Sequence, residues 1–386
     1  MKRHYFDWAA TSDPGMARGG EDSIFANPSS LHEEGRYAKD ALESARIKCA
    51  AILGVKTETL YFTGGGTDAN AIMLHSLLLH ALSLKNYNGE ILYSAIEHPS
   101  IQENCLLLNK LNIPTGIIGA EKDGRVSCEN FSTTLQKHPK ARFAAIMGVN
   151  NETGAVMELG KLVKLARERE KVTKLPIHFH ADMVQAIGKI PFSLSEVDLD
   201  SASFSSHKLG GAFGVGLLYL KKPINALLQG GKQEKGIRAG TENVNGAVNL
   251  AGVLEERAKN ETVVSEYNKA KERFSYLIKG LEKFERYYPI PKDRVKDDKR
   301  FSPWILQAAF KGIPGEVMLR ALDKHGIAVS TGSACSSASK ERKVLSAMGL
   351  NNTEQMEGFR ISQGWTTDME DMDALLNAIE KILSLL

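Results

Sequence analysis

One lysine stands where an amine can do covalent chemistry. Lys208 follows a strand-like run that ends at Ser205, and a glycine-rich stretch comes after it, in the segment SFSSHKLGGAFGVG. Ligands of open α/β sheets bind beyond the carboxyl ends of the strands, and a lysine there forms a Schiff base when its surroundings lower its pKa. A surface lysine at the end of a strand is the alternative, so Lys208 needs supporting residues.

A histidine-rich run offers three kinds of site. In HFHADMVQAIGK, side chains that alternate along a strand place His178, His180 and Asp182 on one face. Two histidines and an aspartate in this pattern are typical of a metal site, which would serve a metal-dependent hydrolase. A second interpretation is that both histidines pack in the core. The third is that Asp182 keeps the pyridine nitrogen of a pyridoxal cofactor protonated.

A glycine-rich turn favours the binding of phosphate. The segment LYFTGGGTDANAIML indicates a strand, a turn and the start of a helix. Amides at a helix start and the helix dipole attract anions, and the hydroxyl of Thr67 adds a donor. Neither GxGxxG nor GxxxxGK[ST] occurs in the chain, so the turn is no nucleotide fingerprint. Because glycine also serves turns that bind nothing, the turn alone leaves both interpretations open.

A lone cysteine lies among residues with almost no side-chain bulk. Cys335 belongs to STGSACSSAS, whereas Cys49, Cys105 and Cys128 lie elsewhere at spacings that suggest no pairing. Four scattered cysteines make no disulfide framework, so we expect a reducing cytoplasm. In that compartment an exposed Cys335 is available as a thiolate nucleophile.

Composition and charge indicate an ordinary globular protein. The 386 residues are 42% hydrophobic and 25% charged, and 49 basic and 46 acidic residues give a net charge of +3. This balance gives no reason to expect a nucleic-acid or membrane partner. The start, MKRHYFDWAA, lacks the apolar stretch of a signal peptide, and no apolar run is long enough to cross a bilayer.

The elements that must position these residues alternate along the first part of the chain. Strand-like runs alternate with helical patterns such as 69–82 and 159–170, and the runs lie at 59–63, 90–95, 142–149, 175–182, 199–205 and 214–220. Such alternation predicts an α/β fold with a largely parallel sheet and helices on both faces. The residues with chemistry follow several of these strands.

The pattern changes near residue 250, which predicts a second, smaller α+β domain. An apolar stripe at steps of three and four predicts a long helix that lies on a core; its members are Val263, Tyr267, Ala270, Phe274, Leu277, Leu281 and Phe284. A strand at 304–310 and a helix at 315–326 follow. Thr367 and Glu370 have the spacing of a capping box at the start of the last helix.

Taken in order along the chain, these segments resemble the pyridoxal-phosphate-dependent cysteine desulfurases of the aminotransferase class V family, in the branch with a long cysteine loop. The motifs that carry the resemblance are YFDWAATS, FANPSSLH, FTGGGTDAN, EHPS, VNNETG, HADMVQAIGK, SFSSHK, GIRAGTEN, TGSACSSAS and RISQGWTT. The resemblance implies fold type I, with a mostly parallel sheet of seven strands. It implies a large cofactor domain at 13–250, and a small domain of 1–12 and 251–386 that carries a mobile cysteine loop at about 328–340.

The resemblance also assigns roles around pyridoxal 5'-phosphate. Lys208 would hold the cofactor and move the α-proton, Asp182 would pair with the pyridine nitrogen, and Gln185 with the ring hydroxyl. His98 would stack on the ring and shuttle protons. The phosphate would be bound by Gly66, Thr67, Ser205 and His207 and, from the neighbouring subunit of a homodimer, by Thr241.

On the substrate side, the resemblance implies that Asn151 and Arg360 hold the carboxylate of L-cysteine, a task that suits the planar fork of arginine. Cys335 would attack the substrate sulfur, so that alanine leaves and a persulfide stays on the enzyme. The persulfide would go to a sulfur-acceptor protein, for iron–sulfur cluster assembly or for tRNA or cofactor thiolation. A selenocysteine or cystine lyase is the alternative within the same chemistry.

The chain departs from the family pattern at several positions. Met183 stands where the family has alanine and would crowd the cofactor ring, and Gln229 stands where histidine is usual. The turn after the lysine contains Gly210 and Gly211 and lacks the usual proline, which predicts a more flexible turn. None of these changes removes a residue that the chemistry requires.

Overall fold

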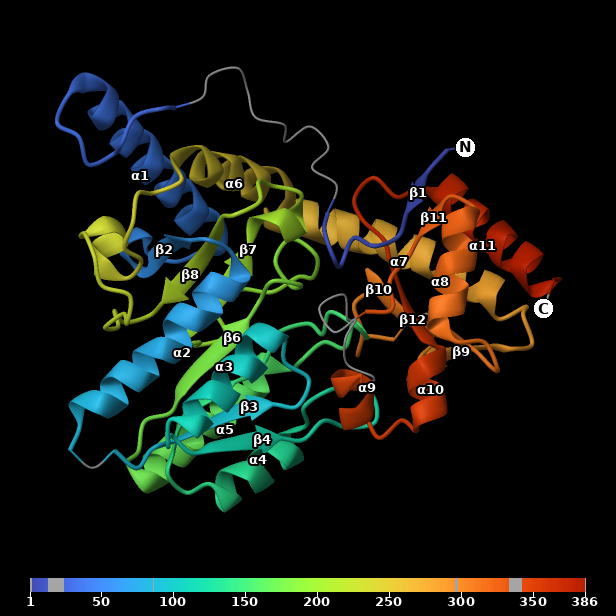
Figure 1. Cartoon of the computed structure of the whole chain (residues 1–386), viewed down its shortest axis with the longest axis horizontal. Helices are drawn as coiled ribbons and strands as arrows, with labels where there is room; N and C mark the ends of the chain where they lie inside the picture. Colours follow the sequence, from blue (N-terminus) through green and yellow to red (C-terminus); the bar gives the residue numbers. More distant parts are fainter. Residues whose placement is uncertain (1, 13–23, 86, 296–297, 333–341, 386) are drawn as a thin grey trace.

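The computed structural model describes residues 2–12, 24–85, 87–295, 298–332 and 342–385. Two bodies of secondary structure lie side by side, and the long helix α7 (Asn260–Leu281) runs from one to the other (Figure 1). The larger body contains the central sheet, and the smaller body contains both ends of the chain.

A seven-stranded sheet forms the centre of the larger body. Its order is β2-β8-β7-β6-β5-β3-β4. The strand bounds are β2 (Leu60–Thr63), β3 (Glu90–Ser94), β4 (Thr115–Ile118), β5 (Ala141–Ala145), β6 (His178–Asp182), β7 (Ser201–Ser205) and β8 (Gly216–Leu220). Strand β8 is antiparallel to both of its neighbours, and the other pairs are parallel. The predicted mostly parallel α/β fold is confirmed.

Each face of this sheet packs into its own apolar core, because neighbouring residues of a strand point to opposite faces. Phe62 and Leu92 belong to one core, and their neighbours Tyr61 and Tyr93 to the other. The first core is covered by α1 (Glu33–Leu53), α4 (Cys128–Lys137), α5 (Leu159–Thr173) and α6 (Val244–Arg257). The second is covered by α2 (Gly66–Ser83) and α3 (Pro99–Lys110).

The smaller body is built from the two ends of the chain. Its antiparallel sheet has the order β12-β10-β9, and β1 pairs with β11 in a second, two-stranded sheet. The elements are β1 (His4–Tyr5), β9 (Tyr287–Ile290), β10 (Ile305–Phe310), α8 (Gly315–Lys324), β11 (Ile327–Ala328), α9 (Lys343–Ala347), α10 (Asn352–Glu357), β12 (Gly358–Ser362) and α11 (Met369–Leu383). The start of the chain therefore lies against its last third.

The apolar stripe predicted after residue 250 is confirmed on α7, where five of its members are buried: Val263, Ala270, Phe274, Leu277 and Leu281. Helix α6 runs through position 250 and packs against α1, so it belongs with the larger body. The predicted division into 13–250 and 1–12 with 251–386 placed the boundary inside α6. We propose the same two-part division with the boundary at the junction of α6 and α7, at residues 258–259.

The capping box of the last helix lies one residue later than predicted. The side chain of Asp368 accepts from the backbone N–H of Asp371 at 2.9 Å, and Asp371 accepts in return from the backbone N–H of Asp368 at 3.0 Å. The hydroxyl of Thr367 instead accepts from the backbone N–H of Gly364 at 2.9 Å. Over the described ranges, no helix is long and apolar enough to cross a membrane.

Candidate active site

A cavity of about 480 Å³ opens beyond the carboxyl ends of the central strands, between the two bodies. Most residues that the sequence singled out line it: Gly66, Thr67, His98, Asn151, Asp182, Gln185, Ser205, His207, Lys208 and Arg360. Parallel strands place the turns that follow them at one edge of a sheet, which explains why segments so distant in the chain meet here.

Lys208 lies in the short helical turn that follows β7, Ser206–Leu209. Its Nζ donates to the carbonyl oxygens of Ala9 at 2.7 Å and Ala10 at 2.6 Å. The hydroxyl of Ser12 donates to the carbonyl oxygen of Lys208 at 2.7 Å. The N-terminal segment therefore fixes both the backbone and the amine of this lysine at the cavity.

Asp182 ends β6 and is held by a buried hydrogen-bond network. Its Oδ2 accepts from Nδ2 of Asn70 at 2.8 Å, and its Oδ1 accepts from the backbone N–H of Val184 at 3.0 Å. The Oδ1 of Asn70 accepts in turn from Nε2 of His180 at 2.9 Å. Sequence reasoning missed Asn70, because 112 residues separate it from Asp182 and only the packing of α2 on the sheet brings them together.

The metal site predicted as an alternative on this strand is wrong. His178 and His180 both contact the hydroxyl of Ser201 at 2.7 Å, and both rings stack on Phe143. Burial lowers the pKa of His180 to about 3 and that of His178 to about 4, so both are neutral packed residues. The described part of the chain contains no group of three or more His, Cys, Asp or Glu side chains placed to hold a metal.

His98 caps the N-terminus of α3 at the wall of the cavity. Its Nδ1 accepts from the backbone N–H of Ser100 at 3.1 Å, so the proton of the neutral ring is on Nε2. Burial lowers the pKa of His98 and Asp182 partly offsets this effect. The imidazole is therefore uncharged near neutral pH, with one N–H to donate.

Glu97, next to His98, also lines the cavity and was missed by sequence reasoning. Its Oε1 accepts from the hydroxyl of Ser94 and from the backbone N–H of Met147. Its Oε2 is buried without a hydrogen-bond partner among the described residues. Burial raises the pKa of Glu97 to about 8, so this side chain is a neutral acid at pH 7.

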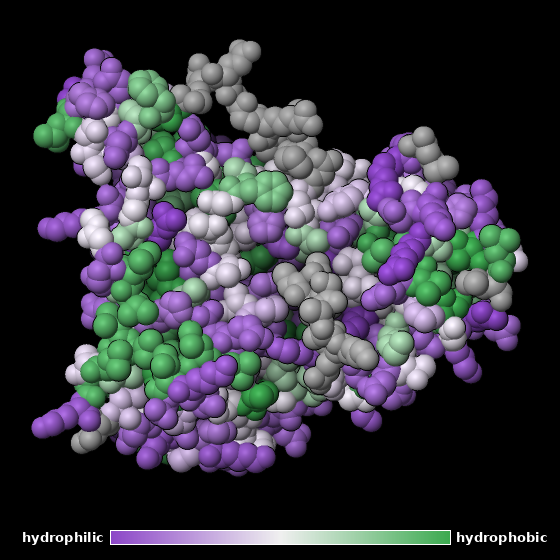
Figure 2. Space-filling view, viewed as in Figure 1, coloured by the Kyte–Doolittle hydropathy of each residue, from purple (hydrophilic) through white to green (hydrophobic). Residues whose placement is uncertain are grey.

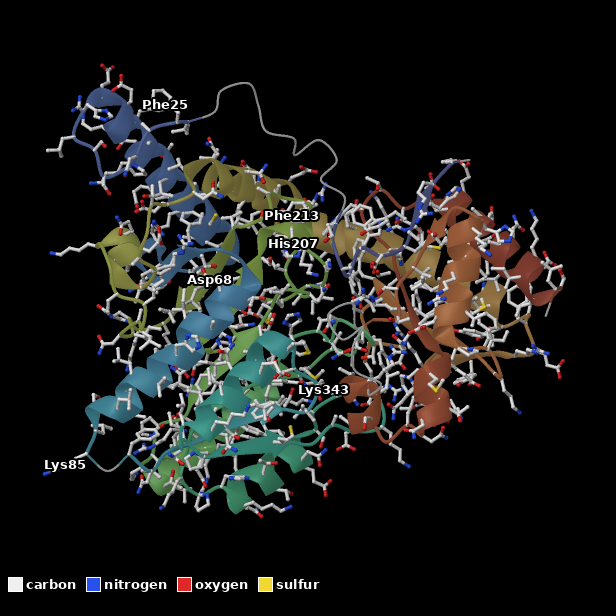
Figure 3. The ribbon with its side chains drawn as sticks, viewed as in Figure 1. Phe25, Asp68, Lys85, His207, Phe213 and Lys343 are labelled. Carbon is white, nitrogen blue, oxygen red and sulfur yellow. The ribbon has the colours of Figure 1, made fainter. Side chains whose placement is uncertain are left out.

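The glycine-rich turn and the end of β7 form one polar end of the cavity. Helix α2 begins at Gly66, and the preceding Gly65 has a φ of 136°, a conformation that favours glycine. Ser205 Oγ lies 2.9 Å from Nδ1 of His207, whose pKa burial lowers to about 4, with Lys208 and Lys189 adding to the effect. Phe213 stacks on His207 and is 65% exposed (Figure 3).

Arg360 comes from β12 in the smaller body, so the cavity needs both bodies. Its Nη1 donates to the carbonyl oxygen of Asn151 at 2.8 Å, and its Nη2 donates to Oδ1 of Asp7 at 2.7 Å. The contact with Asn151 uses its backbone, so the role of this residue and of Arg360 in holding a carboxylate stays a prediction. Sequence reasoning did not single out Asp7.

A second buried amine lies behind Gln185. The Nζ of Lys189 donates to Oε1 of Gln185 at 2.8 Å, and Nε2 of Gln185 donates to the carbonyl oxygen of Ala9 at 2.9 Å. Burial lowers the pKa of Lys189 to about 7, and the charges of Lys208 and Arg360 act in the same direction. Lys189 therefore fixes which end of the Gln185 amide faces the N-terminal segment.

Three predicted features lie elsewhere. Thr241 is exposed and does not line the cavity of its own chain. Cys335 lies outside the described residues, as does most of the predicted cysteine loop. Met183 was expected to crowd the cofactor ring, but it is buried and is not among the described residues that line the cavity. It packs against Gly148 instead: a Cβ atom added to Gly148 would lie 2.6 Å from the sulfur of Met183.

Sequence comparison matches the chain to one protein family and to curated cysteine desulfurases. The family model described as aminotransferase class-V matches residues 4–375. The cysteine desulfurase IscS of Dictyoglomus turgidum is 34% identical over an alignment that covers 99% of this chain and 95% of that protein. A cysteine desulfurase of Sinorhizobium fredii is 34% identical, covering 93% of this chain and 90% of that protein.

Comparison with solved structures matches the chain to NifS-like proteins and to the fold of a cysteine desulfurase. A solved NifS-like protein has a TM-score of 0.88 and 30% identity, with 100% of both chains covered. A NifS-like protein from Rickettsia africae has a TM-score of 0.80 and 26% identity, with 99% of both chains covered. The CsdA cysteine desulfurase of Escherichia coli, at 22% identity and a TM-score of 0.78, shares the fold.

Proposed function

Because this chain belongs to the aminotransferase class-V family and to its cysteine desulfurases, we propose that its cavity removes sulfur from L-cysteine and releases L-alanine. The observation that carries the proposal is that Lys208, Asp182 and Arg360 line one cavity. An amine, a carboxylate and a guanidinium around one space suit an aldehyde cofactor and an amino-acid substrate. A selenocysteine or cystine lyase would use the same three groups and remains the alternative.

The residues present fit pyridoxal 5'-phosphate. Asp182 has each oxygen bonded to one donor, from Asn70 and Val184, and a carboxylate oxygen accepts more than one hydrogen bond. At the other end of the cavity, the start of α2 and the hydroxyls of Thr67 and Ser205 offer donors for a phosphate. When bound, the cofactor supplies an electron sink for the charge that develops at the α-carbon.

The chain's own residues hold and move the protons. In this proposal Lys208 takes the α-proton of the substrate, and the uncharged His98 donates from Nε2. Lys208 must leave the carbonyl oxygens of Ala9 and Ala10 to do so, because both accept from its Nζ. Gln185 is fixed by Lys189 and donates one Nε2 hydrogen to the carbonyl oxygen of Ala9, so its second Nε2 hydrogen would be the donor for the ring hydroxyl.

We further propose that Cys335 receives the sulfur. Its thiolate attacks the sulfur of the substrate, the bond between that sulfur and carbon breaks, and the electron pair stays with the carbon, which is then protonated to give alanine. A persulfide remains on Cys335. Burial raises the pKa of Cys49 to about 12 and also raises that of Cys105, so neither of these thiols is a thiolate near pH 7.

The proposed partners follow from the same chemistry. The persulfide sulfur goes to an acceptor protein, for iron–sulfur cluster assembly or for thiolation of tRNA or a cofactor. A homodimer supplies Thr241 to the neighbouring phosphate site, in agreement with its exposure in its own chain. Leu82 in the last turn of α2 and Leu84, the C-cap of that helix, are exposed, and apolar residues gather over α2 (Figure 2). A cytoplasmic location stays a prediction from cysteine usage.

The decisive variant is Lys208→Ala. Dialysed wild-type protein is expected to retain the visible absorbance of a bound pyridoxal cofactor and to release alanine from L-cysteine; Lys208→Ala is expected to lose both. The matched control is Lys161→Ala, because Lys161 is an exposed lysine paired with Glu158 on α5. An absorbance spectrum of Lys208→Ala that is the same as that of the wild type would contradict the proposal.

A second variant separates cofactor chemistry from sulfur transfer. Cys335→Ser is expected to keep the absorbance and to lose the added sulfur atom that mass spectrometry finds on the peptide of residues 330–340 after incubation with L-cysteine. An unchanged sulfide yield from Cys335→Ser in the presence of a thiol reductant would contradict the role of Cys335.

A further inference from the structure

Both Nη atoms of the Arg360 guanidinium donate hydrogen bonds within the protein, whereas its Nε has no partner among the described residues. Its side chain is 2% exposed. Nη2 donates to Oδ1 of Asp7 at 2.7 Å, and Nη1 donates to the carbonyl oxygens of Asn151 at 2.8 Å and Gly332 at 3.2 Å. Nε is buried and has no acceptor among the described residues. Two N–H groups, the Nε–H and the second hydrogen of Nη2, are therefore left without an acceptor among the described residues, on a side chain that lines the cavity.

Asp7 holds this guanidinium from a rigid backbone. The carbonyl oxygen of Asp7 accepts from the backbone N–H groups of Ala10 at 2.9 Å and Thr11 at 3.2 Å and from the hydroxyl of Tyr5 at 3.1 Å. A β-bridge joins Asp7 to Ser362, two residues beyond Arg360 on β12. The aspartate is thus fixed against the same strand that carries the arginine.

We propose that Asp7 is a positioning residue that sets the plane of the Arg360 guanidinium for the carboxylate of the amino-acid substrate. This inference rests on the proposed function. A carboxylate is held by two parallel N–H···O bonds only when the fork of the arginine faces it correctly. The ion pair with Asp7 uses one hydrogen of Nη2, and the Nε–H together with the remaining Nη2 hydrogen forms the fork for the substrate.

The position of Asp7 makes it more than a support for the fold. Asp7 is not among the described residues that line the cavity, so it acts through Arg360. In the same short segment, the carbonyl oxygen of Ala9 accepts from both Lys208 and Gln185. Loss of the Asp7 carboxylate should therefore weaken the binding of carboxylate-bearing ligands selectively, because the groups that meet the amine and the cofactor keep their own contacts with the backbone.

Two amines that differ by one carboxylate test this selectivity. L-Alanine and ethylamine are titrated into the cofactor-loaded protein, and the change in visible absorbance gives a dissociation constant for each without turnover. Asp7→Ala is expected to raise the dissociation constant of L-alanine about tenfold, the effect of weakening one charged hydrogen bond, and to leave that of ethylamine within about twofold. Asp7→Asn keeps an acceptor oxygen and is expected to raise the L-alanine constant only about threefold.

The matched control is Asp323→Ala, because Asp323 pairs with Arg3 of the same segment at an exposed site and should leave both constants unchanged. Equal weakening of both amines, no weakening of L-alanine, or tighter binding of L-alanine would each overturn the inference. If Asp7→Ala does not fold, Asp7→Asn decides by its ratio of the two constants. A wild-type protein without the visible band would overturn the proposed function and this inference with it.

Discussion

At the residue scale, burial sets the protonation of the groups around the cavity. It raises the pKa of the acid Glu97 to about 8 and lowers the pKa of the bases His207 and Lys189 to about 4 and about 7. Burial disfavours the charged form of any group, so acids and bases shift in opposite directions. Near neutral pH Glu97 and His207 on the cavity wall are therefore uncharged, and the buried Lys189 is divided between its charged and neutral forms.

Glu97 makes a pH-dependent contribution to stability that can be measured. Its folded pKa of about 8 lies above the ordinary value of 4.5, so between these values the folded state holds a proton that the unfolded state has lost. Stability must then fall as pH rises through this window. Between about pH 5.5 and about pH 7.5, we expect the free energy of unfolding of the wild type to fall by about 2 to 3 kcal/mol relative to Glu97→Gln.

The two proteins are compared by urea unfolding at both pH values. Glutamine is neutral throughout and keeps the acceptor for Ser94 and Met147. The shifted histidines His178 and His180 are present in both proteins, so their effects cancel. A difference that stays constant with pH would show that Glu97 is ionised in the folded protein.

Sequence reasoning singled out residues of distinctive chemical type and missed the residues that contact them from distant parts of the chain. Lys208, Asp182 and His98 stand out because each follows a strand-like run. Asp7 and Asn70 do not, because they matter only through Arg360 and Asp182, which are 353 and 112 residues away. The signal for Lys189 was present, four residues after Gln185 in the same motif, but its burial is a property of the fold.

At the element scale, helix α1 is tied to the loop before Thr241 by a buried ion pair. Arg46 donates to both carboxylate oxygens of Glu234 at 2.7 and 2.8 Å, and to the carbonyl oxygen of Leu60 at 3.0 Å. Glu234 has a φ of 45° and also accepts from the backbone N–H of Phe62 at 2.7 Å. The pair therefore holds a strained turn against β2.

Removing one partner of this pair should be costly. Arg46→Met leaves the carboxylate of Glu234 buried without its cation and is expected to lower the free energy of unfolding by about 3 kcal/mol or more. Lys48→Met on the same helix removes a pair with Glu255 and is expected to cost under about 1 kcal/mol. Side-chain exposure explains the contrast: 4% and 1% for the first pair against 47% and 44% for the second. Equal losses in urea unfolding would refute this account.

Element prediction succeeded where the hydrophobic pattern was strong. The central runs became β2, β3, β5, β6, β7 and β8, and the stripe after residue 250 became α7. Strands β4 and β9 were not predicted, because they are four residues each and half of their residues or fewer are buried. The capping box shifted by one residue because Asp368 competes with Thr367 for the same role, and aspartate caps a helix at least as well as threonine.

At the scale of the whole molecule, the exposure of Thr241 leads to a test of shared sites. In a homodimer each cavity would use its own Lys208 and the Thr241 of the other subunit. Lys208→Ala and Thr241→Ala are unfolded and refolded together, so that mixed dimers form. One site of a mixed dimer then has both residues intact, and at limiting cofactor the mixture should bind more pyridoxal phosphate than either variant alone. Binding no better than the average of the two variants would mean that Thr241 does not act across subunits.

The general architecture could be predicted from the sequence, but the way in which the two bodies are joined could not. Alternating elements predicted the larger body, and the change near residue 250 predicted the smaller one. Nothing in the local pattern indicates that β12 brings Arg360 to the end of β6, since that depends on how α7 directs the chain back. Only the family resemblance linked these distant residues.

The contact between Asp7 and Arg360 also sets the order in which the protein becomes competent during synthesis. The two residues are separated by 353 positions, so the aspartate leaves the ribosome long before its partner is made. At roughly 5 to 20 residues per second, the wait is on the order of 20 to 70 s. The central sheet can be complete once β8 has been made, but the pocket beside it still lacks Arg360 until β12 has been translated.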